Sequence, residues 1–453
     1  MTASAVAPQA AVPVVRLAVP ALTVPSPMVT PEVAERTLSS GLRVLAVRRA
    51  AVPLVELRLR ISTVADAARL PASSLLADTA LSGTATRNNI ELAIELQRIG
   101  GDLGASINAD RLLFAGTALT SGLDQLLDLL AEVLTSASYP DREVSIERDR
   151  LVDSIHVALA QPATAAHRAL LRRLYGEHPY GTELPDPAAV ADVAPQALRE
   201  LHTLTAIPDG AVLVLVGDID PQRGLDAVQK AMEAWDTIGT PSLMPSIPPW
   251  RTGAWQITDR PAAVQSSIRI AAQAVPRSHP DYPALQLANL IFGGYFSSRL
   301  VSNIREDKGY TYSPHSGIEH SAAASLLTID ADVATDVTAP ALHEIGYELG
   351  RLATLAPTVQ ELEDVRQYAI GTAALSAATQ SGLASWITTL TAQGLDLNWL
   401  AGHSKRIAAT TLEEVRAAAA RYLAPANTVT VVLGDAAQIA DSTARLHPVE
   451  VQS

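Results

Sequence analysis

The chain has 453 residues, a formal net charge of −13 and no cysteine. Hydrophobic residues make up 48% and charged residues 18%, which suits packed cores and argues against disorder, and the length predicts about two to four domains. The negative charge, without clusters of Lys or Arg among aromatics, argues against nucleic-acid binding. The lack of cysteine excludes disulfides, cysteine-based zinc sites and a cysteine nucleophile.

The first 32 residues are rich in Ala, Val and Pro. Prolines at positions 8, 13, 20, 25, 27 and 31 rule out a continuous helix there. No basic region precedes an apolar core, as a secretory signal would require, and no apolar run is long enough to span a bilayer. We therefore predict a flexible or extended arm over residues 1–32, no membrane insertion and a cytoplasmic location.

Hydrophobic periodicity divides the following part of the chain into short strands and amphipathic helices. The predicted strands cover residues 36–47 (two strands around a Ser-Gly turn), 52–61, 112–118 and 212–218. The predicted helices cover residues 71–82, 89–99, 122–136, 140–159, 164–175, 194–203 and 222–235.

The second half of the chain repeats features of the first. The strand sequence Val429 to Asp435 matches Val212 to Asp218, and the segment beginning at Pro357 matches the one beginning at Pro140. Such self-similarity predicts two copies of one α+β unit, each with a mainly antiparallel sheet covered by helices. Residues 237–252 contain four prolines and form the predicted linker. We expect domains over residues 33–236 and 253–446 that close on each other like a shell.

One stretch, from Phe292 to Tyr312, carries the most specific pattern. Gly293 and Gly294 allow a sharp turn or a close backbone approach. Ser297 and Ser298 follow as candidate caps for a short helix over 299–305, which Lys308-Gly309 ends. A guanidinium and a phenol brought together by this segment can hold a carbonyl oxygen or a peptide carboxylate.

This stretch resembles the C-terminal half of zinc peptidases of the insulinase/pitrilysin (inverzincin) family, especially the short two-domain members related to mitochondrial processing peptidase. The resemblance covers roughly residues 33–446. It implies that Arg305 and Tyr312 bind the substrate backbone opposite the zinc. The alternative is that Arg305 is a surface cation and Tyr312 a half-buried strand residue.

In active members of that family, a His-x-x-Glu-His helix binds zinc through two histidines and activates water through the glutamate. The corresponding stretch here, aligned by Gly83-Thr84, places Ser74, Ala77 and Asp78 at these three positions. The distal glutamate position falls within Glu147–Ser154, with Ser154 the best match. We therefore predict no metal site in this chain and no peptide hydrolysis by it alone.

Other site patterns are weak. His315 and His320 are five residues apart in a strand-like stretch, which places them on opposite faces. His178 lies in a loop, where a turn or packing role is expected. Gly-x-Ser-x-Gly and the phosphate-binding fingerprints are absent.

A chain that has lost the zinc half of the site and kept the Arg–Tyr half is, by this resemblance, the non-catalytic subunit of a heterodimer. Its expected partners are a homologous subunit that carries the zinc and a peptide substrate, with leader or precursor peptides as a specialisation. Two alternatives remain open. One is a structural subunit without a role in proteolysis, like the core subunits of a respiratory complex, and the other is a homodimeric peptide-binding protein.

Overall fold

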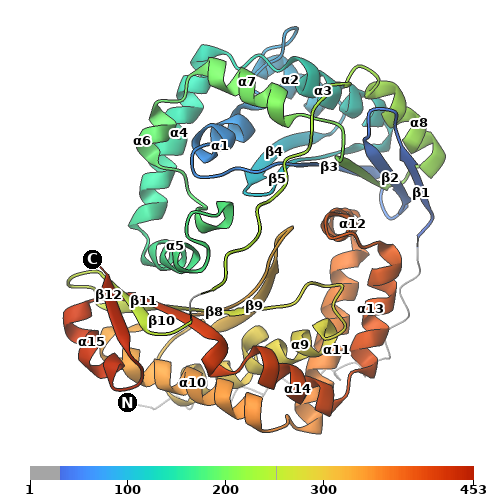
Figure 1. Cartoon of the computed structure of the whole chain (residues 1–453). Helices are drawn as coiled ribbons and strands as arrows, with labels where there is room; N and C mark the ends of the chain where they lie inside the picture. The colour runs from blue at the N-terminus through green and yellow to red at the C-terminus, as the bar shows by residue number, and fades with distance from the viewer. Residues whose placement is uncertain (1–30, 251, 453) are drawn as a thin grey trace, which may run out of the picture.

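The computed structural model describes residues 31–250 and 252–452. The predicted arm over residues 1–32 therefore lies almost entirely outside the described residues. The described chain folds into two halves, each with a six-stranded sheet. Most helices cover the outer face of their own sheet, and the two sheets face each other (Figure 1). This arrangement confirms the predicted α+β fold with two similar units that form a clam shell.

In the first half the strand order is β1-β2-β6-β3-β5-β4, and only the β2–β6 pair is parallel. The strands are β1 (Val33–Thr37), β2 (Arg43–Arg48), β3 (Leu54–Ser62), β4 (Asp102–Asn108), β5 (Arg111–Leu119) and β6 (Val212–Gly217). The helices are α1 (Leu70–Thr79), α2 (Asn89–Arg98), η1 (Thr120–Gly122), α3 (Leu123–Ser136), α4 (Asp141–Ala160), α5 (Pro162–Tyr175), η2 (Pro179–Gly181), α6 (Pro187–Ala191), α7 (Pro195–Thr205) and α8 (Pro221–Ala231).

In the second half the strand order is β12-β7-β11-β8-β10-β9. The strands are β7 (Trp255–Asp259), β8 (Gln265–Gln273), β9 (His315–His320), β10 (Ser325–Ala334), β11 (Thr428–Gly434) and β12 (Val449–Gln452). The helices are α9 (Tyr282–Asn289), η3 (Leu290–Gly294), η4 (Val301–Asp307), η5 (Thr335–Val337), α10 (Thr338–Thr354), α11 (Val359–Ala378), α12 (Gln380–Ala392), α13 (Leu397–Ala409), α14 (Leu412–Tyr422), η6 (Pro425–Asn427) and α15 (Ala436–Ala444).

The two sheets correspond strand for strand except at one edge. Strands β2, β6, β3, β5 and β4 occupy the positions of β7, β11, β8, β10 and β9. The sixth strand differs, because β1 precedes the first sheet and pairs antiparallel with β2, whereas β12 comes from the end of the chain and pairs parallel with β7. The second sheet therefore extends to Gln452, beyond the predicted boundary at 446.

The alternation of residues along β3 shows how each sheet divides its two faces. Val55, Leu57 and Leu59 are fully buried in the core beneath the outer helices. The residues between them include Glu56 and Arg58, which point to the other face and form an ion pair of 2.9 Å. Apolar burial on one face thus fixes the register, and the polar face is directed towards the opposite half.

The two halves exchange helices across their interface. Helix α5 of the first half packs on β8, β10 and β11, and α12 of the second half packs on β2 and β6. Figure 1 shows both helices between the sheets, at opposite ends of the interface. The first cluster is built around Leu170, Leu174, Ala271 and Val431, and the second around Val47, Val214, Leu383 and Ile387. These apolar contacts hold the halves together on both sides.

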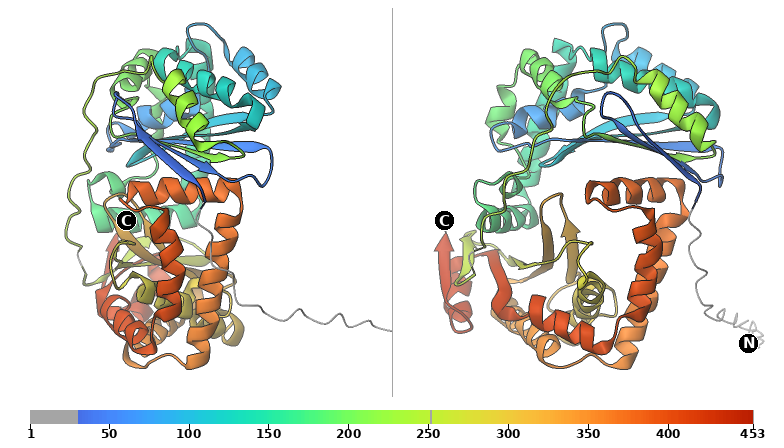
Figure 2. Two further views of the ribbon diagram at one scale, coloured as in Figure 1. Left: turned by 90° about the vertical axis from the view of Figure 1, so that its right-hand side faces the viewer. Right: turned by 45° about the vertical axis from the view of Figure 1, so that its right-hand side comes forward.

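The predicted linker runs along one side of the molecule from one half to the other, as Figure 2 shows. Among its described residues, Met244, Ile247 and Trp250 pack beside the α5 cluster. The ring of His178, in the loop after α5, contacts the Pro245 carbonyl through Nε2 at 3.1 Å. The linker is therefore packed against the first half over part of its length.

Acid is expected to destabilise the protein through His403 on α13. This histidine is 5% exposed, its Nε2 contacts Gln286 Oε1 at 2.7 Å, and its Nδ1 has no partner among the described residues. Burial, with the nearby Arg406 and Arg277, lowers its pKa to about 4. The unfolded chain takes up this proton below about pH 6.5, so stability is complete above that pH and is lost as the pH falls.

Urea unfolding at pH 7 and pH 5 tests this expectation. Between pH 7 and pH 5, the free energy of unfolding of the wild type should fall by about 2 kcal/mol more than that of His403→Gln. This difference corresponds to the 1.5 pH units between pH 6.5 and pH 5. The exposed His156 on α4 provides the control, and His156→Gln should keep the pH dependence of the wild type. An unchanged dependence in His403→Gln would contradict this role.

Candidate functional site

The segment that carries Arg305 is a short π-helical turn, η4. The hydroxyl of Ser298 accepts a hydrogen bond from the Val301 N–H at 3.5 Å at the start of this turn. Gly309, at φ +64°, ends it, and the Tyr310 N–H donates to the Ile304 carbonyl at 2.8 Å. The predicted stop is thus confirmed, and of the two candidate caps Ser298 makes a long contact ahead of η4. The helix is of the wider π type, a geometry that is often found at functional sites.

Gly293 and Gly294 permit a close backbone approach. A Cβ on Gly293 would lie 2.8 Å from Ser316 Oγ, on β9, and neither glycine has a positive φ. The same Ser316 hydroxyl donates a hydrogen bond to Asn289 Oδ1 at 2.7 Å. The glycines therefore let η3 pack directly on β9, the strand that follows Tyr312.

The structure brings Arg305 and Tyr312 together. The Arg305 Cζ lies 5.1 Å from the centre of the Tyr312 ring and 4.8 Å from the centre of the Phe296 ring. Tyr312 lies in the bend before β9 and is 81% exposed, so the half-buried strand position considered above is wrong. The Arg305 side chain is largely covered, and its Nε lies 3.3 Å from Glu306 Oε1.

Neighbouring side chains fix the position of η4. The Asn303 amide donates to Glu344 Oε2 and Glu348 Oε1 on α10, each at 3.0 Å. Just before η4, Arg299 forms a two-point ion pair with Glu361 at 2.6 and 3.0 Å. Burial opposes ionisation of Glu361, but hydrogen bonds from Arg299 and Thr358 lower its pKa to about 2. Arg305 is therefore presented by a well-anchored segment, so little of its side-chain position is left to be fixed by a binding partner.

The positions that the resemblance aligns with the zinc motif lie on α1. Ala77 is buried in the core, and Ser74 lines a cavity of about 330 Å³ that the turn between β9 and β10 also borders. Asp78 is exposed on one side, but the surrounding protein displaces enough water to raise its pKa. The neighbouring Glu147 adds to this shift and Arg150 opposes it.

The residues at these positions do not fit a zinc ion. Zinc needs at least three nitrogen, sulfur or carboxylate donors, and this place offers two carboxylates, Asp78 and Glu147, beside the cation Arg150. Arg150 is itself paired with Glu147 at 3.1 Å, and the Ser154 hydroxyl donates to the Leu151 carbonyl on its own helix. In residues 31–250 and 252–452, no group of three His, Cys, Asp or Glu side chains is arranged to hold a metal ion.

His315, His320 and His178 are engaged in local contacts. His315 and His320 bound strand β9, with His315 at 3.4 Å from Asp330 and His320 at 2.8 Å from the Ser325 hydroxyl. Burial lowers the pKa of His320 to about 3. His178 accepts the Tyr180 N–H through Nδ1 at the start of η2, which agrees with the expected turn role.

Two features near the predicted site residues have no signal in the sequence. Phe296 stands inside the predicted motif, but no spacing rule places its ring beside Arg305. The second feature is a polar group across the two halves: the contact with Glu183 at 3.3 Å raises the pKa of His167, although burial opposes this shift. Glu319, on β9, has a pKa raised by burial and by the nearby Glu183. Only the fold brings these three residues together.

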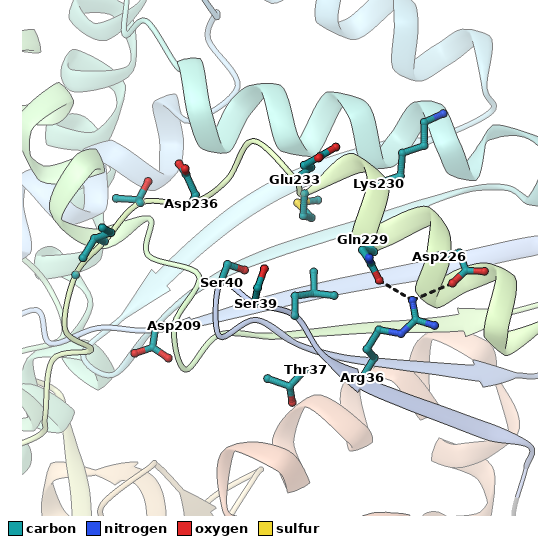
Figure 3. A pocket seen from close by; sticks show the side chains of 15 residues that line it. Arg36, Thr37, Ser39, Ser40, Asp209, Asp226, Gln229, Lys230, Glu233 and Asp236 are labelled. Atoms are coloured by element: carbon teal, nitrogen blue, oxygen red, sulfur yellow. Dashed lines mark hydrogen bonds and ion pairs between the residues drawn. The ribbon is translucent and has the colours of Figure 1, made fainter.

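A cavity of about 1060 Å³ lies away from these residues, between the β1–β2 turn, α8 and the start of the linker (Figure 3). Its most prominent cation, Arg36, donates to Asp226 Oδ1 at 2.9 Å and to Gln229 Oε1 at 2.8 Å. None of the predicted site residues lines this cavity. Among the described residues, no helix combines the length and the apolar character needed to cross a membrane.

Each half of the chain matches a model of the same protein family. A family model described as insulinase (peptidase family M16) matches residues 70–188, and one described as the peptidase M16 inactive domain matches residues 192–368. An uncharacterized zinc protease of Mycobacterium leprae is 27% identical over 315 residues, which cover 66% of this chain and 68% of that protein. Subunit 1 of the mouse mitochondrial cytochrome b-c1 complex is 24% identical over 226 residues, 49% of this chain and 47% of that protein.

Solved structures have the same fold. The peptidase M16 inactive domain from Pseudomonas fluorescens superposes with a TM-score of 0.82 at 22% identity, over 89% of this chain and 98% of that one. A protease from Helicobacter pylori gives a TM-score of 0.82 at 19% identity, over 90% of this chain and 100% of that one.

Proposed function

Because the chain belongs to the insulinase (M16) family of peptidases, we propose that it is the non-catalytic subunit of a heterodimeric zinc metalloprotease. In this proposal a homologous subunit with an intact His-x-x-Glu-His helix carries the zinc. This chain contributes Arg305 and Tyr312 to the shared site, and the complex cleaves peptides.

The observation that carries the proposal is the pairing of an anchored Arg305 with an exposed Tyr312. The guanidinium and the ring are 5.1 Å apart, and Tyr312 is directed to the surface, where a second molecule can reach it. At the same time Ser74, Ala77 and Asp78 provide neither a zinc ligand set nor a base at the position of the glutamate. These observations support an interpretation in which this chain keeps one half of a peptidase site and lacks the other half.

These two residues can bind and polarise a peptide group. The guanidinium offers several N–H donors in a fixed plane, and the phenol offers one O–H donor. Donors aimed at a carbonyl oxygen hold the peptide in place and stabilise negative charge as it develops there. They cannot activate water, so the nucleophile must come from the zinc that the partner binds.

We extend the proposal to the substrate and to a cytoplasmic location of the complex. A site enclosed between two subunits admits small or unfolded peptides more readily than folded proteins, which suits leader or precursor peptides.

A second candidate is a structural or peptide-binding subunit with no role in proteolysis. The similarity to subunit 1 of the mouse cytochrome b-c1 complex favours it, because that protein is named as one subunit of a larger complex. In this case Arg305 and Tyr312 would be remnants, and replacing them would change no reaction rate.

Peptide cleavage followed by mass spectrometry tests the proposal. The chain alone, a co-expressed zinc-bearing M16 homologue alone and their mixture are incubated with peptides, with and without EDTA. We expect cleavage by the mixture, inhibition of it by EDTA and none by this chain alone. EDTA-sensitive cleavage by this chain alone would contradict the assignment of Ser74, Ala77 and Asp78 to the zinc motif.

A further inference from the structure

Phe296 is an exposed apolar side chain in contact with the Arg305 guanidinium. It is 68% exposed, although it lies in the turn between two anchored helical segments, and its ring is 4.8 Å from the Arg305 guanidinium carbon. The preceding residue, Tyr295, packs its ring 5.4 Å from that of Tyr368 on α11. Tyr368 is itself 42% exposed, so the aromatic surface continues from Arg305 towards α11.

We propose that Phe296 determines specificity by binding an apolar substrate side chain next to the peptide group that Arg305 and Tyr312 hold. This inference rests on the proposed function of those two residues. The apolar side chain would belong to a residue within two positions of the cleaved bond, because the ring and the guanidinium are in direct contact.

The exposure of the ring argues for a ligand in addition to Arg305. A cation–π contact at an exposed site is weak, and it uses only part of the ring surface. Covering the remaining apolar surface would remove it from water, which is favourable. An aliphatic or aromatic substrate side chain gains this energy, whereas a serine or a charged side chain does not.

The alternative role for Phe296 is to position Arg305 and nothing more. The two roles differ in what they do to different substrates. A ring that only positions the guanidinium affects every peptide equally, because Arg305 contacts the backbone. A ring that binds a side chain affects only peptides that carry an apolar residue at the matching position.

The test compares two peptides that differ only in one residue beside the cleaved bond, leucine in one and serine in the other. Dissociation constants are measured for this chain by fluorescence anisotropy, and kcat/KM for its mixture with a zinc-bearing homologue. For the wild type we expect a preference for the leucine peptide in both measurements. In Phe296→Ala this preference should fall about 10-fold or more, while the serine peptide should change little.

Two further variants complete the experiment. Phe296→Leu keeps an apolar surface and should retain most of the preference. Leu375→Ala removes an equally exposed apolar side chain (74%) from α11 and serves as the matched control, with no effect expected. An equal loss for both peptides in Phe296→Ala, or an unchanged preference, would overturn the inference.

The same data separate this inference from the proposed function. If the mixture cleaves no peptide, the proposed function fails, but the dissociation constants still report whether Phe296 discriminates leucine from serine. If the mixture cleaves and Arg305→Ala slows it while Phe296→Ala leaves the preference intact, only the inference about Phe296 is wrong.

Discussion

Replacing Arg305 by alanine is expected to lower kcat/KM of the mixture with a zinc-bearing homologue about 100-fold or more. Removing a preorganised donor that stabilises the developing charge typically costs 10²–10³ in rate. Arg305 is preorganised because Asn303 attaches η4 to α10 through two hydrogen bonds of 3.0 Å. Initial rates over a range of peptide concentrations, with size-exclusion chromatography to verify the complex, give the measurement.

Two further variants test whether the rate loss in Arg305→Ala is specific to the Arg305–Tyr312 pair. Tyr312→Phe keeps the ring beside the guanidinium and loses only the hydroxyl, so we expect a loss of about 10-fold, near the value of one hydrogen bond. Arg416→Ala, on α14 of the same half, removes an arginine that pairs, within residues 31–250 and 252–452, with its helix neighbour Glu413, and it should leave the rate unchanged. A full rate in Arg305→Ala with an intact complex would show that the Arg–Tyr pair is a remnant.

Replacing Asp110 by alanine is expected to reduce the free energy of unfolding by about 3–5 kcal/mol. Asp110 lies in the β4–β5 turn and is 7% exposed. It accepts the Tyr180 hydroxyl at 2.9 Å, the Ala322 N–H of the opposite half at 2.8 Å, and Arg60 at 3.5 Å. Without the carboxylate, the equally buried Arg60 loses its counter-ion and the two halves lose a direct hydrogen bond.

Urea unfolding at pH 7 measures this loss. Asp110→Asn keeps an oxygen acceptor for Tyr180 and Ala322 but leaves Arg60 without a negative partner, so its stability should lie between those of the wild type and Asp110→Ala. Asp128, exposed on α3, provides the control, and Asp128→Ala should change stability by less than about 0.5 kcal/mol. A wild-type stability for Asp110→Ala would show that the apolar clusters alone hold the halves together.

Much of the fold could be predicted from the sequence because its strands and helices have clear periodicity. The alternating Val55, Leu57 and Leu59 identify β3, and the repeated strand before Gly217 and Gly434 reveals the two related units. Strand β4 was missed, since Asp102 to Asn108 is an edge strand with small and polar residues and pairs only with β5. The pairing of β12 with β7 depends on the tertiary fold and has no local signal.

The candidate site could be predicted only in part. The spacing of Ser298, Arg305, Gly309 and Tyr312 gave the cap, the stop and the two polar groups, because these depend on local backbone rules. The family resemblance, which the comparisons confirm, gave their expected role. The contact of Phe296 with Arg305 and the approach of Glu319 to His167 depend on the packing of separate segments, and no spacing in the sequence encodes them.

The most direct test of the shared site is a titration of activity. A fixed amount of a zinc-bearing homologue receives increasing amounts of this chain, and the rate of peptide cleavage is measured at each step. The proposal predicts that the rate rises and reaches a plateau at one equivalent, and that Arg305→Ala reaches a much lower plateau at the same ratio. A rate that does not depend on added chain, in a complex that demonstrably forms, would contradict the claim that the site is shared between two subunits.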